Sequence, residues 1–260
     1  MASGKVIEST GLADPLPILT TITADPVLRH HYRLGLVITT VDAVNGDRQL
    51  NSQPESIKQA AVADRLAVTK TDIASPETAN RLLARLRALN PLAPVLRTAE
   101  DNLDPAELFG NDLFDLDSKA AEVRRWFESE RLAGHDREHQ HRHDPNRHGD
   151  DIEAFALTFD RPIAWTAFGL WLSMLLNRHG EAILRVKGIL AVEGEPAPVA
   201  VHAVQSLVHA PMHMTRWPGA DRHTRLVFIC KGLDTAAVRR SFAAFVLKAA
   251  ADNPSVSQAR

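Results

Sequence analysis

Short runs of β-branched and apolar residues alternate with helical segments over roughly the first 110 residues, and this alternation limits the fold more than any other feature. Two runs, Leu34–Asp42 and Arg65–Thr69, have the composition of strands covered on both faces. Shorter strands are predicted at Lys5–Glu8 and Pro94–Arg97. Strands separated by helices favour parallel pairing with right-handed crossovers. The region therefore predicts part of a doubly wound α/β sheet.

The helix between the last two strands has clear signals at both ends. Ser75 can cap its N-terminus, and Pro76 suits the first helical position. The apolar stripe consists of Leu82, Leu83, Leu86 and Leu89. Asn90-Pro91 then ends the helix.

The second half of the chain has an α+β pattern. Strands are predicted at Ile152–Phe159, Ala182–Val192, Val199–Val208 and Thr224–Cys230, with a helix at Ile163–Asn177. The last three strands are close enough in sequence to pair antiparallel. Asp234 caps a final helix, whose buried face is predicted to hold Val238, Phe242, Phe245 and Val246.

Composition excludes several classes of protein. A formal net charge of -2 gives no electrostatic reason to expect a nucleic-acid or membrane partner. No apolar run approaches the ~20 residues needed to span a bilayer, and the first residues lack the apolar core of a secretory signal. The single cysteine, Cys230, excludes an internal disulfide framework and is expected to be a buried apolar residue. We expect a cytoplasmic protein.

Two short motifs follow predicted strands. Glu8-Ser9-Thr10-Gly11 has the E-x-x-G form in which an acidic residue holds Mg²⁺ through water and a glycine lets the backbone approach a γ-phosphate. Alone it is a weak signal, because a glycine between a strand and a loop gives the same pattern. In Thr69-Lys70-Thr71-Asp72, one carboxylate could accept both N–H donors on the edge of guanine. Asp72 would do so, with the Lys70 stem along the base and Thr69 bracing the loop. The alternative is a solvated loop.

Several longer strings stand in a definite order along the chain. They are ESTGLADP, VDAVN at 41–45, the run from Gln59 to Arg65 leading into VTKTD, LNP at 89–91, LRVKGIL at 184–190, Val204-Gln205, Trp217-Pro218 and RLVFI at 225–229. In order and spacing they resemble the CobW-like GTPase family. The resemblance implies a partial P-loop-type GTPase domain at 1–131, a His-rich linker at 132–151, a CobW-type C-terminal α+β domain at 152–251 and a tail at 252–260. It also implies a GTP-dependent metallochaperone or metal-insertion protein, related to cobalamin-biosynthesis and zinc-handling members, with a client metalloprotein. Glu8 and Gly11 would be the Mg²⁺ and γ-phosphate pair, and Thr69, Lys70 and Asp72 the guanine loop.

The chain departs from the family pattern in two places. It contains neither G-x-x-x-x-G-K-[S/T], the phosphate-binding loop, nor the family's C-x-C-C metal motif. Without the loop's N–H groups and lysine, the triphosphate loses most of its charge-stabilising contacts. We therefore expect an N-terminally truncated chain, compromised in GTP binding and hydrolysis. The strand beside the missing loop should expose a sheet edge, through which the chain forms oligomers.

A histidine-rich stretch follows in the linker. His135, His139, His141, His143 and His148 lie among acidic residues, and imidazole with carboxylate suits Zn²⁺, Ni²⁺ or Co²⁺. These histidines are predicted to capture a divalent metal weakly; the alternative is a solvated linker. For the whole chain, the alternative to a GTPase metallochaperone is a non-enzymatic metal-binding or protein-interaction module that keeps the C-terminal domain and this loop.

Overall fold

The computed structural model describes residues 4–32, 34–99, 108–109 and 152–248, and the chain divides into two compact units, Met1–Leu108 and Phe109–Arg260. Each unit has its own apolar core. The domain boundary predicted between residues 131 and 132, the linker and the tail from 252 lie outside the described residues, so these limits stay predictions.

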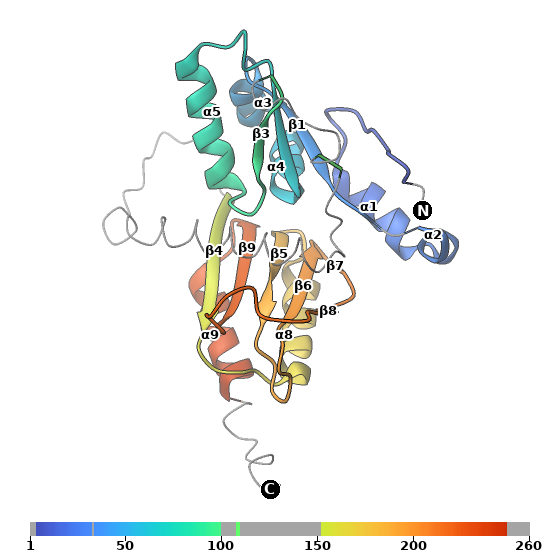
Figure 1. Ribbon diagram of the computed structural model, residues 1–260, viewed down its shortest axis with the longest axis vertical. Coiled ribbons are helices and arrows are strands. Elements are labelled where there is room, and N and C mark those ends of the chain that lie inside the picture. Colours follow the sequence, from blue (N-terminus) through green and yellow to red (C-terminus); the bar gives the residue numbers. More distant parts are fainter. Residues whose placement is uncertain (1–3, 33, 100–107, 110–151, 249–260) are drawn as a thin grey trace, which may run out of the picture. The chain divides into compact units, whose positions relative to one another are not determined.

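The first unit contains a parallel sheet in the order β1-β2-β3 (Figure 1). Its strands are β1 (Ile38–Asp42), β2 (Arg65–Thr69) and β3 (Val95–Arg97). Its described helices are α1 (Pro15–Ala24), α2 (Pro26–His31), α3 (Gly46–Ser52), α4 (Pro54–Val62) and α5 (Pro76–Leu89). The predicted strands at 34–42, 65–69 and 94–97 are confirmed, the first being shorter than expected. The parallel α/β arrangement predicted for this region is also confirmed.

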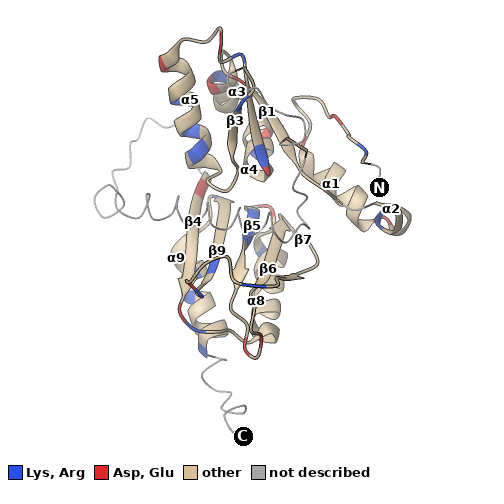
Figure 2. Cartoon of the chain, in the orientation of Figure 1, with Lys and Arg blue, Asp and Glu red and all other residues tan. Residues whose placement is uncertain are grey.

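Helix α5 begins and ends where the sequence predicts. The Ser75 hydroxyl accepts a hydrogen bond from the Thr78 amide at 3.2 Å, and Pro76 occupies the first turn. The predicted stripe faces the core of this unit, where Leu82, Leu83 and Leu86 are fully buried. β1 and β2 each contain one charged residue, at a strand end: Asp42 ends β1 and Arg65 begins β2. Helix α5, in contrast, carries charged residues along its length (Figure 2).

The strand predicted at Lys5–Glu8 is wrong. Residues 4–10 have no regular secondary structure, and Val6 and Ile7 are 77% and 64% exposed. A strand is stabilised by cross-strand pairs and by burial of one face. Within the described residues neither is available to this segment, so β-propensity alone does not form the strand. The open sheet edge consequently lies at β1, which pairs only with β2 among the described strands.

The second unit has an antiparallel sheet with helices packed on one face. The strand order is β4-β9-β5-β6-β7, and β8 pairs with β6. The strands are β4 (Ile152–Phe159), β5 (Ile183–Leu190), β6 (Val199–Val204), β7 (Leu207–Val208), β8 (Met212–His213) and β9 (Thr224–Lys231). The helices are α8 (Trp165–His179), α9 (Thr235–Phe242) and the π-helical η1 (Ala243–Leu247). The predicted α+β fold with antiparallel strands is confirmed.

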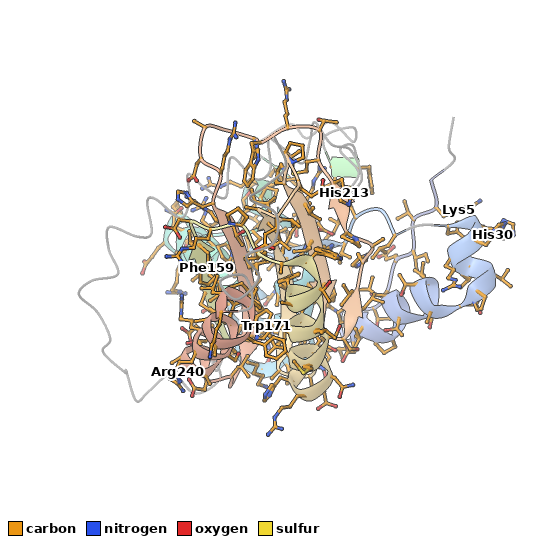
Figure 3. The ribbon with its side chains drawn as sticks, turned by 90° about the horizontal axis from the view of Figure 1, so that it is seen from below. Lys5, His30, Phe159, Trp171, His213 and Arg240 are labelled. Carbon is orange, nitrogen blue, oxygen red and sulfur yellow. The ribbon has the colours of Figure 1, made fainter. Side chains whose placement is uncertain are left out.

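Aromatic side chains join the helices to this sheet. Trp171 of α8, which is labelled in Figure 3, meets the rings of Phe228 and Phe242 edge-on and donates a hydrogen bond to the Ser241 hydroxyl at 3.0 Å. The buried Cys230 thiol lies on β9 within the same core, as predicted. Burial, and then the negative charge of Glu153, raise the pKa of Cys230 to about 12, so this thiol stays protonated.

Two predictions for the second unit need correction. The strand predicted at Val199–Val208 is divided into β6 and β7, because Gln205 takes a left-handed backbone with φ of 49° and turns the chain. The last helix buries Val238, Phe242 and Val246 as predicted, but Phe245 is 43% exposed. Residues 243–247 are π-helical, so the spacing of an α-helix no longer places Phe245 on the buried face.

Candidate functional site

The carboxyl ends of β1 and β2 lie side by side in the first unit. Their register pairs Val41 with Val68 and Asp42 with Thr69, so the chain leaves both strands at the same edge of the sheet. Open α/β sheets bind ligands at the carboxyl ends of their parallel strands. The VDAVN and TKTD segments leave the sheet at this edge.

The Thr69–Asp72 loop is held to β1 by backbone and side-chain contacts. The Ala43 amide donates to the Thr69 carbonyl at 2.9 Å, and the Thr69 hydroxyl donates to the Val41 carbonyl at 3.4 Å. Lys70 has a left-handed backbone with φ of 61°, which is uncommon outside glycine. Its ammonium donates to the Asp42 carboxylate at 2.6 Å. The loop is thus a fixed structure that is attached to the neighbouring strand.

The Asp42 carboxylate accepts four hydrogen bonds at this edge of the sheet. It accepts from the Val44 amide at 2.7 Å, the Asn45 amide at 3.1 Å and the Asn45 side-chain amide at 3.3 Å, besides Lys70. Burial raises the pKa of Asp42, but the bonds from Lys70, Val44 and Asn45 outweigh it and lower the pKa to about 2. Asp42 is therefore anionic throughout the physiological range. Sequence reasoning gave Asp42 no role, although an aspartate that ends a buried strand before A-V-N is a recognisable turn-capping pattern.

The other loop residues differ in accessibility. Asp72 is exposed, so its carboxylate is open to a ligand. Thr71 is buried, and its hydroxyl has no hydrogen-bond partner among the described residues. The loop therefore offers a planar acceptor, the carboxylate of Asp72, beside the aliphatic stem of Lys70. Such a pair can accept two adjacent N–H donors while covering an apolar face.

Among the described residues, the side-chain hydrogen bonds to the segment that contains Glu8 and Gly11 lie at its C-terminal end. Gln59 of α4 donates to the carbonyls of Thr10 (3.4 Å), Gly11 (3.2 Å) and Ala13 (2.7 Å). Glu8 and Gly11 are exposed, and a Cβ on Gly11 would meet no atom within 4 Å. No hydrogen bond or ion pair within the described residues joins them to the Thr69–Asp72 loop. Their predicted roles toward Mg²⁺ and a γ-phosphate stay predictions.

One further anchor holds the following residues. The Lys58 ammonium of α4 pairs with the Asp14 carboxylate at 2.6 Å, and Asp14 also caps α1 by accepting from the Leu16 amide at 3.0 Å. Gln59 and Lys58 were missed as functional candidates. The sequence signal for these two residues is their position directly before Ala60-Ala61-Val62, the apolar end of a helix.

The predicted metal ligands lie elsewhere. His135, His139, His141, His143 and His148 fall outside the described residues. In the part of the chain that the structure describes, no three His, Cys, Asp or Glu side chains gather closely enough to hold a metal ion. Among the described helices, none is both long and apolar enough to cross a membrane.

Comparison with known proteins gives matches over both units. Residues 5–97 match the family described as CobW/HypB/UreG, nucleotide-binding domain, and residues 152–246 match the cobalamin synthesis protein cobW C-terminal domain. The zinc chaperone YjiA of Escherichia coli is 32% identical over 238 residues, which are 92% of this chain and 69% of YjiA. The zinc-regulated GTPase metalloprotein activator 1 of Schizosaccharomyces pombe is 31% identical over 114 residues, 44% of this chain and 27% of that protein. The crystal structure of Zn(II)-bound YjiA GTPase from E. coli superimposes with a TM-score of 0.69 at 28% identity, covering 90% of this chain and 68% of that chain.

Proposed function

Because this chain belongs to the CobW-type GTPase family, we propose that it is a metal-handling protein that recognises guanine nucleotide through Thr69, Lys70 and Asp72. One observation supports this most directly: the Thr69–Asp72 loop is fixed at the carboxyl end of β2, with Lys70 held by Asp42 and Asp72 left accessible. The zinc-related functions named for its relatives favour a divalent metal, zinc or cobalt, as the cargo.

The residues fit the base of the nucleotide. Guanine has adjacent N–H donors at N1 and N2, and the Asp72 carboxylate can accept both. Adenine lacks this pair of donors, so it would leave the carboxylate without its hydrogen bonds, which gives strong discrimination. The Lys70 stem supplies an apolar surface for the base, and Thr69 braces the loop through its bond to the Val41 carbonyl.

The residues present do not fit the triphosphate equally well. The 260 residues contain no G-x-x-x-x-G-K-[S/T], and Glu8 and Gly11 lie on an exposed stretch. Catalysis of phosphoryl transfer depends on positioning and on charge stabilisation around the phosphates. We therefore propose that this polypeptide by itself binds guanine nucleotide weakly and does not hydrolyse GTP, with Mg²⁺ held poorly or not at all.

A fluorescent guanine-nucleotide titration tests the guanine loop. Asp72→Ala should weaken binding by about 10- to 100-fold, the value of hydrogen bonds to a charged acceptor. Glu77→Ala, which removes another exposed carboxylate five residues later, is the matched control and should leave the affinity unchanged. Equal affinities for the wild type and Asp72→Ala would refute the assignment.

A change of base gives a sharper test of the same loop. Xanthine keeps the N1–H donor but has a carbonyl where guanine has an amino group. The side-chain amide of an asparagine can accept from that N–H and donate to that carbonyl. Asp72→Asn should therefore prefer xanthosine nucleotides to guanosine nucleotides. A loss of both ligands together would show only that the loop had been damaged.

Metal capture by the histidine-rich stretch is the second part of the proposal. Five histidines within 135–148 offer the imidazole ligands that zinc and cobalt accept. Zinc titration of the full chain with His139, His141 and His143 replaced by alanine should show that most of the zinc binding is lost, whereas replacing His30 and His31 should not. Zinc binding without any guanine-nucleotide binding would favour the alternative, a non-enzymatic metal-binding module.

A further inference from the structure

The two oxygens of the Asp42 carboxylate make different contacts. Oδ1 accepts from the amides of Val44 and Asn45 and so closes the turn that leads into α3. Oδ2 accepts from the Lys70 ammonium at 2.6 Å and from the Asn45 side chain at 3.3 Å. One oxygen therefore shapes its own loop, while the other reaches the loop that follows the neighbouring strand.

Lys70 is fixed at both ends of its side chain. At the backbone, its left-handed φ of 61° is held by the Ile73 and Ala74 amides, which donate to the Lys70 carbonyl at 3.3 and 3.1 Å. At the far end, its ammonium is attached to Asp42, although the side chain is 52% exposed. A lysine on a surface normally samples many rotamers, and ordering it costs conformational entropy. Here the ammonium at the end of the stem is already held by Asp42, at the end of β1, before any ligand arrives.

We propose that Asp42 is a positioning residue of the guanine loop: it holds the Lys70 ammonium, so that the aliphatic stem is kept in one place as a surface for the face of the base. This inference rests on the proposed guanine function. Asp42 does not contact the nucleotide; it acts through Lys70, while Asp72 reads the edge of the base. Preorganisation of this kind reduces the entropy that binding must overcome.

The competing interpretation is an ordinary ion pair that only supports the fold. The unit offers a matched example of one, because Asp47 of α3 pairs with Arg85 of α5 at 2.9 Å, away from Thr69–Asp72 in sequence. Asp42 precedes α3 and Asp47 lies in its first turn, and each has a basic partner on another segment. Asp47→Asn therefore reproduces the chemical change without touching Lys70.

Asp42→Asn is the informative variant. An asparagine keeps an Oδ1 oxygen that can accept from the amides of Val44 and Asn45, so the turn survives, but it removes the anion that holds Lys70. The accessibility of the Lys70 amine is then measured by timed acylation of the full chain, followed by mass spectrometry. Lys58, whose ammonium pairs with Asp14 at 2.6 Å, serves as an internal reference in every sample.

The expected result is faster acylation of Lys70 in Asp42→Asn, by about fivefold or less, the ceiling for an exposed ion pair. Lys58 should be unchanged, and Asp47→Asn should behave as the wild type at both lysines. Unchanged Lys70 labelling in Asp42→Asn would overturn the role given to Asp42, whatever the nucleotide results.

Nucleotide binding decides whether this positioning serves guanine recognition. Asp42→Asn should weaken fluorescent guanine-nucleotide binding by about two- to fivefold, within the same ceiling for an exposed ion pair, whereas Asp47→Asn should not. In a Lys70→Met background, which keeps an apolar stem without an ammonium, Asp42→Asn should have no further effect. Equal losses in Asp42→Asn and Asp47→Asn, or a full effect in the Lys70→Met background, would overturn the proposal. No binding by the wild type would instead refute the proposed guanine function itself.

Discussion

Asn90 offers the clearest test of how the first unit is held together, because its side chain is 0% exposed and fully hydrogen-bonded. Its amide nitrogen donates to the carbonyls of Ala60 (2.9 Å), Ala61 (3.1 Å) and Ala63 (2.9 Å), and its oxygen accepts from the amides of Leu92 (3.2 Å) and Ala93 (3.1 Å). The donors satisfy carbonyls at the end of α4, which have no partner within the helix. One side chain thus connects the end of α4 to the turn between α5 and β3.

The loss of unfolding free energy in Asn90→Ala follows from counting the groups that the substitution leaves without partners. Asn90→Ala removes five polar contacts, but the two N–H groups of the amide serve three carbonyls, so the loss is equivalent to about four hydrogen bonds and leaves buried backbone groups on both sides. A net contribution of about 1 kcal/mol for each bond gives roughly 4 kcal/mol, and water entering the vacated space would reduce the loss to about 3 kcal/mol. Because a domain is stable by only about 5–15 kcal/mol, the variant should be close to unfolding.

Urea denaturation followed by circular dichroism measures the effect. Asn51→Ala, at an exposed position of α3, is the matched control and should change the free energy of unfolding by about 0.5 kcal/mol or less. Asn90→Asp is expected to be worse than Asn90→Ala, since it places a negative charge against three carbonyl oxygens. A loss below about 1 kcal/mol for Asn90→Ala would show that the bonds contribute little and would refute the reasoning.

Four further outcomes are expected. Gly188→Ala should destabilise the second unit by about 3 kcal/mol or more in thermal melts, because the added Cβ would lie 2.0 Å from the Arg225 carbonyl oxygen; unchanged melting would contradict this. The Cys230 thiol, with its pKa of about 12, should resist Ellman's reagent at pH 8 until urea unfolds the chain, and immediate reaction would refute its burial. The pKa of Asp42 is lowered from 3.8 to about 2, so the contribution of this carboxylate to stability is present above pH 4 and is lost as the pH falls toward 2. The difference in unfolding free energy between wild type and Asp42→Asn at pH 6 should therefore shrink at pH 2.5. A difference that stays constant would contradict this. The open edge of β1 should promote self-association in size-exclusion chromatography as concentration rises, and Thr40→Lys should reduce it; a monomer at all concentrations would count against this.

Sequence reasoning succeeded where local chemistry alone decides the structure. The limits of α5 follow from Ser75, Pro76 and Asn90, which act on their own backbone neighbours. The strand at Arg65–Thr69 is apolar enough to be buried wherever the sheet places it. The antiparallel pairing of β5, β6 and β9 likewise follows from strands that are close in sequence.

The same reasoning failed where the structure depends on a pairing partner or on a backbone conformation that the residue type does not signal. Lys5–Glu8 has the composition of a strand, but Val6 and Ile7 remain exposed because no described strand pairs with them. Gln205 interrupts a β-branched run through its backbone conformation, which its residue type does not signal. In both cases the strand-like pattern is present in the sequence, but the pattern alone does not produce the strand.

In the candidate site, too, the sequence predicted the residues with a local motif and missed the residue whose role depends on a distant segment. The TKTD motif identified Lys70 and Asp72, because a carboxylate after a buried strand has a direct chemical relation to guanine. It did not identify Asp42, which lies 28 positions before Lys70 and reaches it only because β1 and β2 are adjacent and parallel, with Asp42 opposite Thr69. A residue that acts through another residue has no motif of its own, so its role becomes visible only when the register of the sheet is known. If Asp42 positions Lys70 as proposed, aspartates at the end of the strand before such a loop deserve the same test in related chains.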